Sequence, residues 1–190
     1  MATGYRKVIY SQMLSLDGYI EARDGNIDWS IPGAELFQHF LGEENTIDTY
    51  LYGRRTYENM AGYWQGADTN AASTESEVQY ARTWQKTPKV VFSTTLEVAG
   101  ENSRIVKEHI AEEVGRLKAQ EGLSMSLGGA ALAESFMQMD LIDEYHLYIH
   151  PVVLGGGKPF FPMQTSITNL KLLETKTFDI SVVYLRYERT

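Results

Sequence analysis

The sequence predicts an α/β fold in which a mostly parallel central sheet has an antiparallel C-terminal edge and helices on both faces. Short runs of β-branched and aromatic residues alternate with segments of helical periodicity, the pattern of parallel strands joined by helical crossovers. The last such runs, over residues 170–189, have no helical segment between them and predict an antiparallel pair. With 190 residues, 43% of them hydrophobic, the chain suffices for one sizeable core, so we expect a single domain over residues 1–190.

The N-terminal half alternates between strands and helices. Val8, Ile9 and Tyr10 predict a buried strand within residues 5–14, and the next stretch, rich in Gly, Asp and Asn, predicts a loop over residues 15–30. Apolar residues at helical spacing follow, at Leu36, Phe37, Phe40 and Leu41. The remaining predicted elements are a strand over residues 47–52, a short helix over residues 54–60 and a polar loop over residues 66–76, followed by a helix over residues 77–86 and a strand over residues 89–93.

The C-terminal half continues this alternation. Ile110, Val114 and Leu117 predict an amphipathic helix, residues 123–127 a strand and residues 130–139 a helix. The next stretch predicts a half-buried strand, with one face in the core and one in water, because apolar and polar positions alternate. These positions are Tyr145, Leu147 and Ile149 on one face, and Glu144, His146, Tyr148 and His150 on the other. The two final strands are expected to break near Asp179.

The composition excludes several classes of protein. The formal net charge of -8, with no long basic stretch to offset it, argues against a surface that binds nucleic acid or an anionic membrane. The chain has no cysteine, which excludes disulfides, thiolate metal sites and a cysteine nucleophile. No apolar run approaches the roughly 20 residues of a membrane span, and the first residues do not resemble a signal peptide, so we expect a cytoplasmic protein. A small anionic ligand is still allowed, because one or two arginines can bind a phosphate in an acidic protein.

A turn with two glycines follows the predicted strand at residues 123–127. Gly128 and Gly129 let a ligand approach the backbone closely, and the helix that starts at Ala130 offers unpaired N–H groups and partial positive charge. These are the properties of a phosphate site, although a tight turn without a ligand has the same sequence. A Rossmann-type dinucleotide site is disfavoured, because the chain lacks both its three-glycine spacing and its acidic residue.

Two further polar turns follow predicted strands. Gly53-Arg54-Arg55-Thr56 places two guanidinium groups at the start of a helix, where they can bind phosphate oxygens, although a solvated pair of charges would have the same sequence. Ser93-Thr94-Thr95 brings hydroxyl donors to the end of a third strand. Because ligands in open α/β sheets bind at the carboxyl ends of the strands, we expect the three turns to converge at one edge.

Two other patterns do not support a site. The glycine run at residues 151–159 has Val152 and Pro159 where a phosphate-binding P-loop needs a glycine and a Ser or Thr, so we expect only a supporting loop. His146 and His150 would lie about 13 Å apart on a strand, which does not suit a shared zinc ion. We expect the four histidines to be structural or at the surface, and we predict no metal site.

Four segments carry a resemblance to a known family. Three of them are Ser15-Leu16-Asp17-Gly18, Gly53-Arg54-Arg55-Thr56-Tyr57-Glu58 and Leu127-Gly128-Gly129-Ala130-Ala131-Leu132. The fourth is the long stretch over residues 141–161, with His150-Pro151 followed by the glycine run and by Lys158-Pro159-Phe160-Phe161. The first three resemble the dihydrofolate reductase-like family, and the fourth is similar to the C-terminal reductase domain of the bifunctional riboflavin biosynthesis protein RibD.

The resemblance implies a dihydrofolate reductase-like fold with NADPH as the hydride donor, a small heterocyclic substrate and a homodimer. Arg54-Arg55-Thr56 would hold the NADPH phosphates, and Ser93-Thr94 would face the adenosine 2′-phosphate. Gly128-Gly129-Ala130 would face the pyrophosphate, and Ile20 would touch the nicotinamide through its backbone. The other implied cofactor contacts belong to the same motifs: Gly53, Ala131 and Leu132.

Three departures from the family concern the substrate half. Two residues after Pro32, where a folate reductase has its catalytic carboxylate, this chain has Ala34, and Glu35 comes one position later. The Gly-Arg-Arg-Thr segment stands in place of the Asp-Asp-Pro segment with which riboflavin-pathway enzymes hold a ribose phosphate. Leu127 stands in place of the glutamate that these enzymes have before their glycine pair. The cofactor half therefore fits the family more closely than the substrate half.

The resemblance implies hydride transfer from NADPH to a C=N bond of a pyrimidine- or pterin-like substrate, most like the reaction of 5-amino-6-(5-phosphoribosylamino)uracil reductase. A proton must also arrive, from Glu35, Asp17 or water. We favour Glu35, which we expect near the floor of the pocket beside Trp29, a predicted substrate contact; Asp17 could instead only shape the turn before Gly18. Two alternatives stay open, a reductase of quinones or nitro compounds and an NADPH-binding module without turnover.

Overall fold

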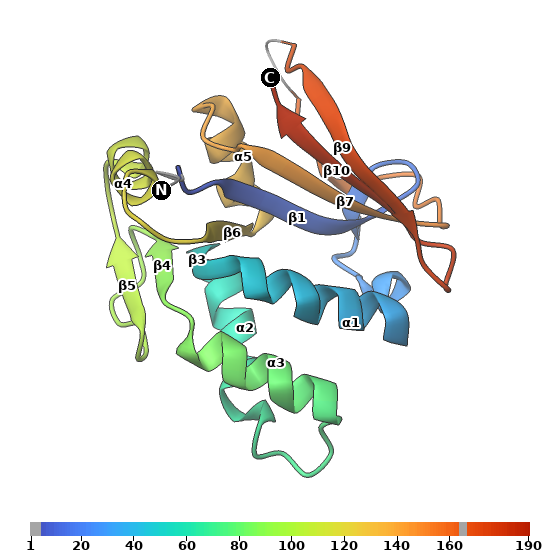
Figure 1. Cartoon of the computed structure of the whole chain (residues 1–190), viewed down its shortest axis with the longest axis horizontal. Helices are drawn as coiled ribbons and strands as arrows, with labels where there is room; N and C mark the ends of the chain where they lie inside the picture. The colour runs from blue at the N-terminus through green and yellow to red at the C-terminus, as the bar shows by residue number, and fades with distance from the viewer. Residues whose placement is uncertain (1–4, 164–166) are drawn as a thin grey trace.

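The computed structural model describes residues 5–163 and 167–190, and an eight-stranded sheet lies at its centre (Figure 1). The strands, in their order across the sheet, are β5 (Ser103–Val106), β4 (Lys89–Phe92), β3 (Ile47–Gly53), β6 (Ser124–Gly128), β1 (Val8–Ser15), β7 (Glu144–His150), β10 (Val183–Arg189) and β9 (Leu170–Thr177). The strands from β5 to β7 run parallel, whereas β10 runs antiparallel to both β7 and β9. The predicted mostly parallel sheet with an antiparallel C-terminal edge is confirmed.

Helices cover both faces of this sheet, as predicted (Figure 1). In the described part of the chain the α-helices are α1 (Ala34–Glu43), α2 (Arg54–Ala67), α3 (Glu75–Lys86), α4 (Ile110–Lys118) and α5 (Ala130–Gln138). Helices α4 and α5 pack on one face, and α1, α2 and α3 pack on the other. Short 3-10 segments precede and follow α1, at Asp28–Ser30 and Glu44–Thr46.

The alternation of side chains on the central strands divides the core between the two faces. Leu51 of β3 packs in the larger cluster, together with Val114 of α4 and Phe136 of α5. Its neighbour Tyr50 points to the opposite face and packs in the cluster that contains Trp84 of α3. Burial of this many apolar and aromatic side chains supplies the main stabilising free energy of the fold.

Three short strands were not predicted. β5 lies at the parallel edge of the main sheet, while β2 (Tyr19–Ala22) and β8 (Gly157–Pro159) form a separate antiparallel pair. The loops expected over residues 15–30 and 151–159 are therefore joined to each other. Gly157 makes the pairing possible, because its φ is +148° and a Cβ there would lie 2.0 Å from the carbonyl oxygen of Glu21. Such a contact between distant segments leaves no periodic pattern in either one.

Two helices extend beyond their predicted bounds. α2 continues to Ala67 rather than ending near residue 60, and α3 begins at Glu75 rather than at residue 77. A capping box sets the start of α3, since the Thr74 Oγ1 accepts from the Glu77 backbone N–H and the Glu77 carboxylate accepts from that of Thr74.

The expectation that β7 is half-buried is wrong, because both of its faces are covered. Glu144, His146, Tyr148 and His150 are all at most 4% exposed. Helix α1 covers this side, where Leu36 packs against Tyr148. Burial of the charge on Glu144 is compensated by three donors that reach its carboxylate: Lys7 Nζ at 2.6 Å, Arg186 Nε at 2.7 Å and His146 Nε2 at 3.2 Å.

A membrane-spanning helix is not found within residues 5–163 and 167–190: none of the helices there combines the required length with sufficient apolar character.

Candidate cofactor and substrate site

The three polar turns singled out in the sequence lie at one edge of the sheet. β3 is the common neighbour of β4 and β6, and all three strands are parallel. In the register of these strands Gly53 pairs with Phe92, and Tyr52 pairs with Gly128. The turns that begin at Gly53, Ser93 and Gly128 therefore leave the sheet side by side, and their expected convergence is confirmed.

Two helices start at this edge without side-chain caps. Gly53 is the N-cap of α2 and Gly129 the N-cap of α5, and neither helix start has a capping hydrogen bond from a side chain. The first N–H groups of both helices are therefore left for solvent or a ligand. The two helix starts also touch: Gly129 has a φ of +102°, and a Cβ there would lie 2.5 Å from Thr56 Oγ1. A larger residue at position 129 would separate the two turns.

The side chains around these helix starts differ in how exposed they are and in whether they already have hydrogen-bond partners, so they are not equally free to contact a ligand. Arg54 and Arg55 are exposed, and the nearest carboxylate to Arg54, that of Glu58, lies 3.8 Å away. Ser93 Oγ accepts from the backbone N–H groups of Thr95 and Leu96, so it also shapes the turn after β4. Thr94 and Ala131 are exposed, Ala130 is half-buried, and Leu132 is buried in the core, so its side chain faces away from a ligand.

Asp17 ties the turn after β1 to a distant loop. Its carboxylate accepts from Ser15 Oγ at 2.7 Å and from the backbone N–H groups of Leu154 and Gly155, at 3.1 and 2.7 Å. The bond from Ser15 and the two backbone bonds lower the pKa of Asp17. This geometry suits a residue that fixes the turn, because the carboxylate oxygens are already engaged as acceptors. Ile20 follows on β2, half-buried against the larger core cluster.

A cavity of about 820 Å³ lies between α1 and the start of α3, with β1, β6 and β7 behind it. This volume suffices for a whole heterocyclic ligand. Its apolar and aromatic lining is Ile9, Met13, Ile31, Pro32, Ala34, Phe37, Phe40, Ile47, Met60, Tyr63, Trp64, Tyr80 and Tyr148. Its polar lining consists of Ser11, Gln12, Gln38, Thr74, Ser76, Ser126 and His146, and of the carboxylates Glu43, Glu44 and Glu77. No lysine or arginine is among these lining residues of the described chain.

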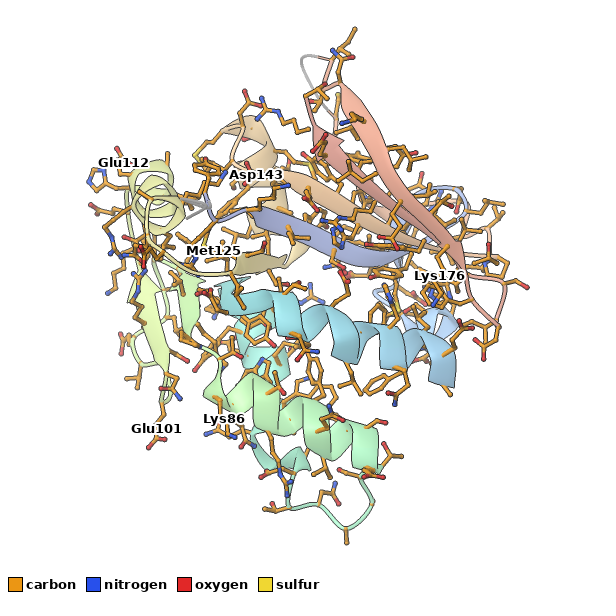
Figure 2. All side chains as sticks on the ribbon, in the orientation of Figure 1. Lys86, Glu101, Glu112, Met125, Asp143 and Lys176 are labelled. Atoms are coloured by element: carbon orange, nitrogen blue, oxygen red, sulfur yellow. The ribbon has the colours of Figure 1, made fainter. Side chains whose placement is uncertain are left out.

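The expectation that Glu35 lies at the pocket floor beside Trp29 is wrong. The Glu35 carboxylate is 45% exposed, accepts from the Asp179 backbone N–H at 3.0 Å and lies 3.2 Å from Lys176 Nζ, which Figure 2 labels beside the start of α1. Ala34 and Phe37 line the cavity instead, because one step along a helix turns the side chain by about 100°. Trp29 packs edge-on against His150 with ring centroids 5.7 Å apart, and it is not among the lining residues.

The three carboxylates of the cavity differ in their partners. Glu77 is satisfied by Thr74 and by the Tyr63 hydroxyl, which lower its pKa. Glu43 lies 3.3 Å from Nδ1 of His146, a contact that lowers the pKa of Glu43. Glu44 accepts a hydrogen bond from the Tyr50 hydroxyl, and burial raises its pKa to about 6.

His146 lines the cavity and also contacts Glu144, the carboxylate that Lys7 and Arg186 bind. Its Nδ1 also meets the Tyr184 hydroxyl at 3.1 Å, and its Nε2 lies 3.2 Å from Glu144. Burial alone would lower the pKa of His146, but its contacts with Glu144 and Glu43 outweigh burial and raise it. His146, Glu43 and Glu44 are site residues that were not predicted from the sequence. For His146 the available signal was its place among the polar positions of β7, on a face of the strand that is covered by protein and not by solvent. No group of side chains in the described residues is arranged to hold a metal ion.

Comparison with known proteins identifies the family. The model of the RibD C-terminal domain family matches residues 6–184. The chain belongs to the RibD C-terminal domain family. Two Bacillus subtilis (strain 168) relatives have full-length similarity: the uncharacterized protein YyaP, 36% identical over 184 residues (96% of this chain, 94% of YyaP), and the uncharacterized protein YwjB, 32% identical over 193 residues (97% and 98%).

Solved structures agree on the fold of this RibD C-terminal domain. A putative riboflavin biosynthesis protein from Shewanella sp. PV-4 superposes with a TM-score of 0.76 at 23% identity, covering 97% of this chain and 99% of that one. The dihydrofolate reductase of Enterococcus faecalis complexed with NADP(H) superposes with a TM-score of 0.61 at 14% identity, covering 97% and 96%. A Thermotoga maritima deaminase/5-amino-6-(5-phosphoribosylamino)uracil reductase gives 0.67 at 13% identity, covering 98% of this chain and 57% of that one. The predicted dihydrofolate reductase-like fold is confirmed.

Proposed function

We propose that the protein is an NADPH-dependent reductase that transfers hydride to a heterocyclic substrate of pyrimidine or pterin type. The observation that carries this proposal is the meeting of three strand-end turns at one edge of the sheet, two of which open uncapped helices. Uncapped helix starts and exposed arginines are suited to the phosphates of a dinucleotide.

The residues at this edge fit a phosphorylated dinucleotide. The N–H groups that begin α2 and α5 would bind phosphate oxygens, and the absence of a side chain at Gly129 lets the two helix starts lie close to each other. Arg54 and Arg55 would add charge-assisted bonds, with Ser93 and Thr94 beside the 2′-phosphate. Ile20 would contact the nicotinamide through its backbone.

The cofactor edge and the cavity share structural elements. Helix α2 begins with the arginines, and its later residues Met60, Tyr63 and Trp64 line the cavity. Strand β6 contributes Ser126 to the cavity and ends at Gly128. A cofactor bound along the strand ends would therefore have its reactive ring near the cavity, which supports hydride transfer to a ligand bound there.

The side chains of the cavity would orient the substrate and exclude water. Bound NADPH would supply the hydride. Phe37, Phe40 and Met13 provide apolar walls that hold a flat ring and keep solvent out. The proton that completes the reduction would come from water, since the carboxylates of Glu35 and Asp17 are both engaged by backbone N–H groups.

Cofactor affinity tests this proposal. Arg54→Ala and Arg55→Ala are each expected to weaken NADPH binding by about 1–3 kcal/mol, because a charge-assisted phosphate contact is lost. The loss should be larger for NADPH than for NADH. Calorimetric titration of the full chain measures both, with Arg82→Ala on the exposed face of α3 as the matched control. Absence of NADPH binding to the unmodified chain would refute the proposal, and equal losses for both cofactors would remove the 2′-phosphate role.

Two further candidates follow from the position of Ala34. With no carboxylate there, and with Glu35 turned toward Lys176, the chain lacks the proton donor of a folate reductase at the start of α1. This favours either a reductase of quinones or nitro compounds, or an NADPH-binding module without turnover. An assay of NADPH oxidation with dihydrofolate, 5-amino-6-ribosylaminouracil 5′-phosphate and quinones separates the two. Turnover of quinones alone supports the quinone or nitro reductase. Binding of NADPH without oxidation by any of these compounds supports the module without turnover.

A further inference from the structure

The cavity is long, and its two ends differ. Helix α1 runs back from the carboxyl edge of the sheet, where β1 ends, to the amino edge, where β3 begins. Ala34 and Glu43, at its first and last residues, both line the cavity, and they are about 14 Å apart at 1.5 Å per residue. The Ala34 end lies at the proposed cofactor edge. The opposite end, called the Glu44 end, is formed by Glu44, Trp64 and Tyr80.

The Glu44 end has an aromatic wall. The rings of Trp64 and Tyr80 are tilted against each other with centroids 4.5 Å apart, and Tyr63 packs edge-on against Trp64 at 4.6 Å. Trp64 and Tyr80 also pack with Tyr50, the residue whose hydroxyl binds Glu44. A flat or cationic ring gains both stacking and cation–π attraction at such a wall.

Glu44 is the carboxylate of this cavity that has unused acceptor capacity and is not paired with an ionisable base. Glu77 accepts three hydrogen bonds and Glu43 is paired with His146, whereas the Tyr50 hydroxyl is the one polar partner of the Glu44 carboxylate within residues 5–163 and 167–190. A carboxylate can accept about four hydrogen bonds. A half-buried carboxylate without a cationic partner is unfavourable unless a ligand supplies donors.

We infer that the substrate is elongated and is anchored at the Glu44 end by a flat, amino-bearing ring without phosphate. The amino or ring N–H groups of this ring donate to Glu44, and its faces lie against Trp64 and Tyr80. The reducible bond lies at the Ala34 end, next to the cofactor edge. This inference rests on the proposed reductase function and specifies its substrate class.

A phosphate group does not suit the same place. Three carboxylates line the cavity, and none of its lining residues in the described chain is a lysine or arginine. A phosphate dianion there would meet like charges at short range without a compensating cation. This separates the expected substrate from the ribose phosphate compounds of the riboflavin-pathway reductases.

Binding of ring fragments tests the inference without any turnover. 2,4-Diaminoquinazoline presents amino donors, and quinazoline has the same ring system without them. In calorimetry on the full chain at pH 8, the diamino compound is expected to bind at least about tenfold more tightly than quinazoline, since its hydrogen bonds reach a charged acceptor. It should bind equally well with and without saturating NADPH, because it occupies the Glu44 end. In the second pair, 5-amino-6-ribosylaminouracil is expected to bind more tightly than its 5′-phosphate.

Two variants assign the preference to the Glu44 end. Glu44→Gln keeps an acceptor for Tyr50 but removes the charge, so it is expected to abolish most of the tenfold preference for the diamino compound while quinazoline binds as before. Trp64→Leu should weaken both compounds, because stacking is lost. The matched control is Glu121→Gln, an exposed carboxylate remote from the cavity, which should change neither.

The outcomes separate this inference from the proposed function. Equal binding of the two quinazolines, tighter binding of the 5′-phosphate, an unchanged preference in Glu44→Gln, or no binding of any of the four compounds overturns the inference, whatever NADPH does. Absence of NADPH binding overturns the reductase, while a Glu44-dependent preference for the diamino compound would still support the ligand class.

Discussion

Glu144 and Glu44 are two carboxylates on the same side of the sheet, and they differ in how many groups of the protein contact them. Glu144 on β7 is fully buried, and Lys7, Arg186 and His146 all contact its oxygens. Glu44, just after α1, is half-buried at the cavity and has the hydroxyl of Tyr50 as its partner.

The pKa values of the two groups move in opposite directions. Burial alone would raise the pKa of Glu144, but bonds from His146, Arg186 and Lys7 outweigh it and hold the pKa well below its usual range. Burial raises the pKa of Glu44 to about 6, and the single hydroxyl does not offset it. Glu144 therefore has a structural role, in which its charge stabilises the fold. Glu44 has the perturbed pKa and the unused acceptor capacity that are typical of a ligand site.

The largest expected effect is that of Glu144→Gln, which removes the charge that Lys7, Arg186 and His146 contact. The free energy of unfolding at pH 7 should fall by about 3 kcal/mol, at the lower end for a broken buried ion pair, because Lys7 and Arg186 are partly exposed and can regain water. Urea unfolding measures the change.

The pH dependence of the same variant tests the cause. The folded-state pKa of Glu144 is depressed, so its stabilisation is present above the unfolded pKa near 4.5 and is lost as the pH falls below it. The stability difference between the unmodified chain and Glu144→Gln should therefore shrink from pH 7 to pH 3. A difference that stays constant with pH would contradict an electrostatic role for Glu144.

Glu44→Gln should have a smaller effect of opposite sign. The folded-state pKa of Glu44 is raised, so ionisation of this group costs stability as the pH rises from about 4.5 to about 6. At pH 8 the variant should be more stable than the unmodified chain by about 1–2 kcal/mol, after allowance for partial exposure, and near pH 4 the two should be equal. Thermal unfolding at both pH values checks this, with Glu121→Gln as the control. A destabilised variant at pH 8 would contradict this expectation, because it would mean that a cation stabilises the Glu44 carboxylate in the folded chain.

Tyr50→Phe should have the smallest effect. It removes the one donor of Glu44, so the free energy of unfolding at pH 8 should fall by about 1 kcal/mol. The pKa of Glu44 should rise further above about 6, since the Tyr50 hydroxyl is the bond that lowers it. A carbon-detected NMR titration of the Glu44 carboxyl group measures this directly. An unchanged pKa would contradict the hydrogen bond.

The cofactor edge could be predicted from the sequence because its signals are local. Each of the three turns is a short polar or glycine-rich segment that directly follows a strand, and strand, turn and helix start are adjacent in the chain. Parallel strands then bring such turns to one edge, whatever their separation along the chain. The motifs of Gly53-Arg54-Arg55-Thr56 and Gly128-Gly129 also carried the resemblance to the family.

The cavity could not be predicted in the same way, because its residues come from seven helices and strands (β1, β3, β6, β7, α1, α2 and α3) and from the 3-10 segment after α1. Their roles depend on which face of its element each side chain occupies. The position of Glu35 after Pro32 predicts a proton donor, yet one step along α1 turns this side chain away toward Lys176. The polar residues of β7 were expected in water, yet α1 covers them and Glu144 acquires three buried partners.

The sequence by itself determined the α/β alternation, the antiparallel C-terminal edge and the turns at the strand ends, since these follow from periodicity and backbone chemistry within short segments. Tertiary structure alone decided which carboxylate is paired and which is left open to a ligand. The physical reason is that burial and partner charges, which set the cost of a carboxylate, are properties of the packed elements and not of neighbours in the chain.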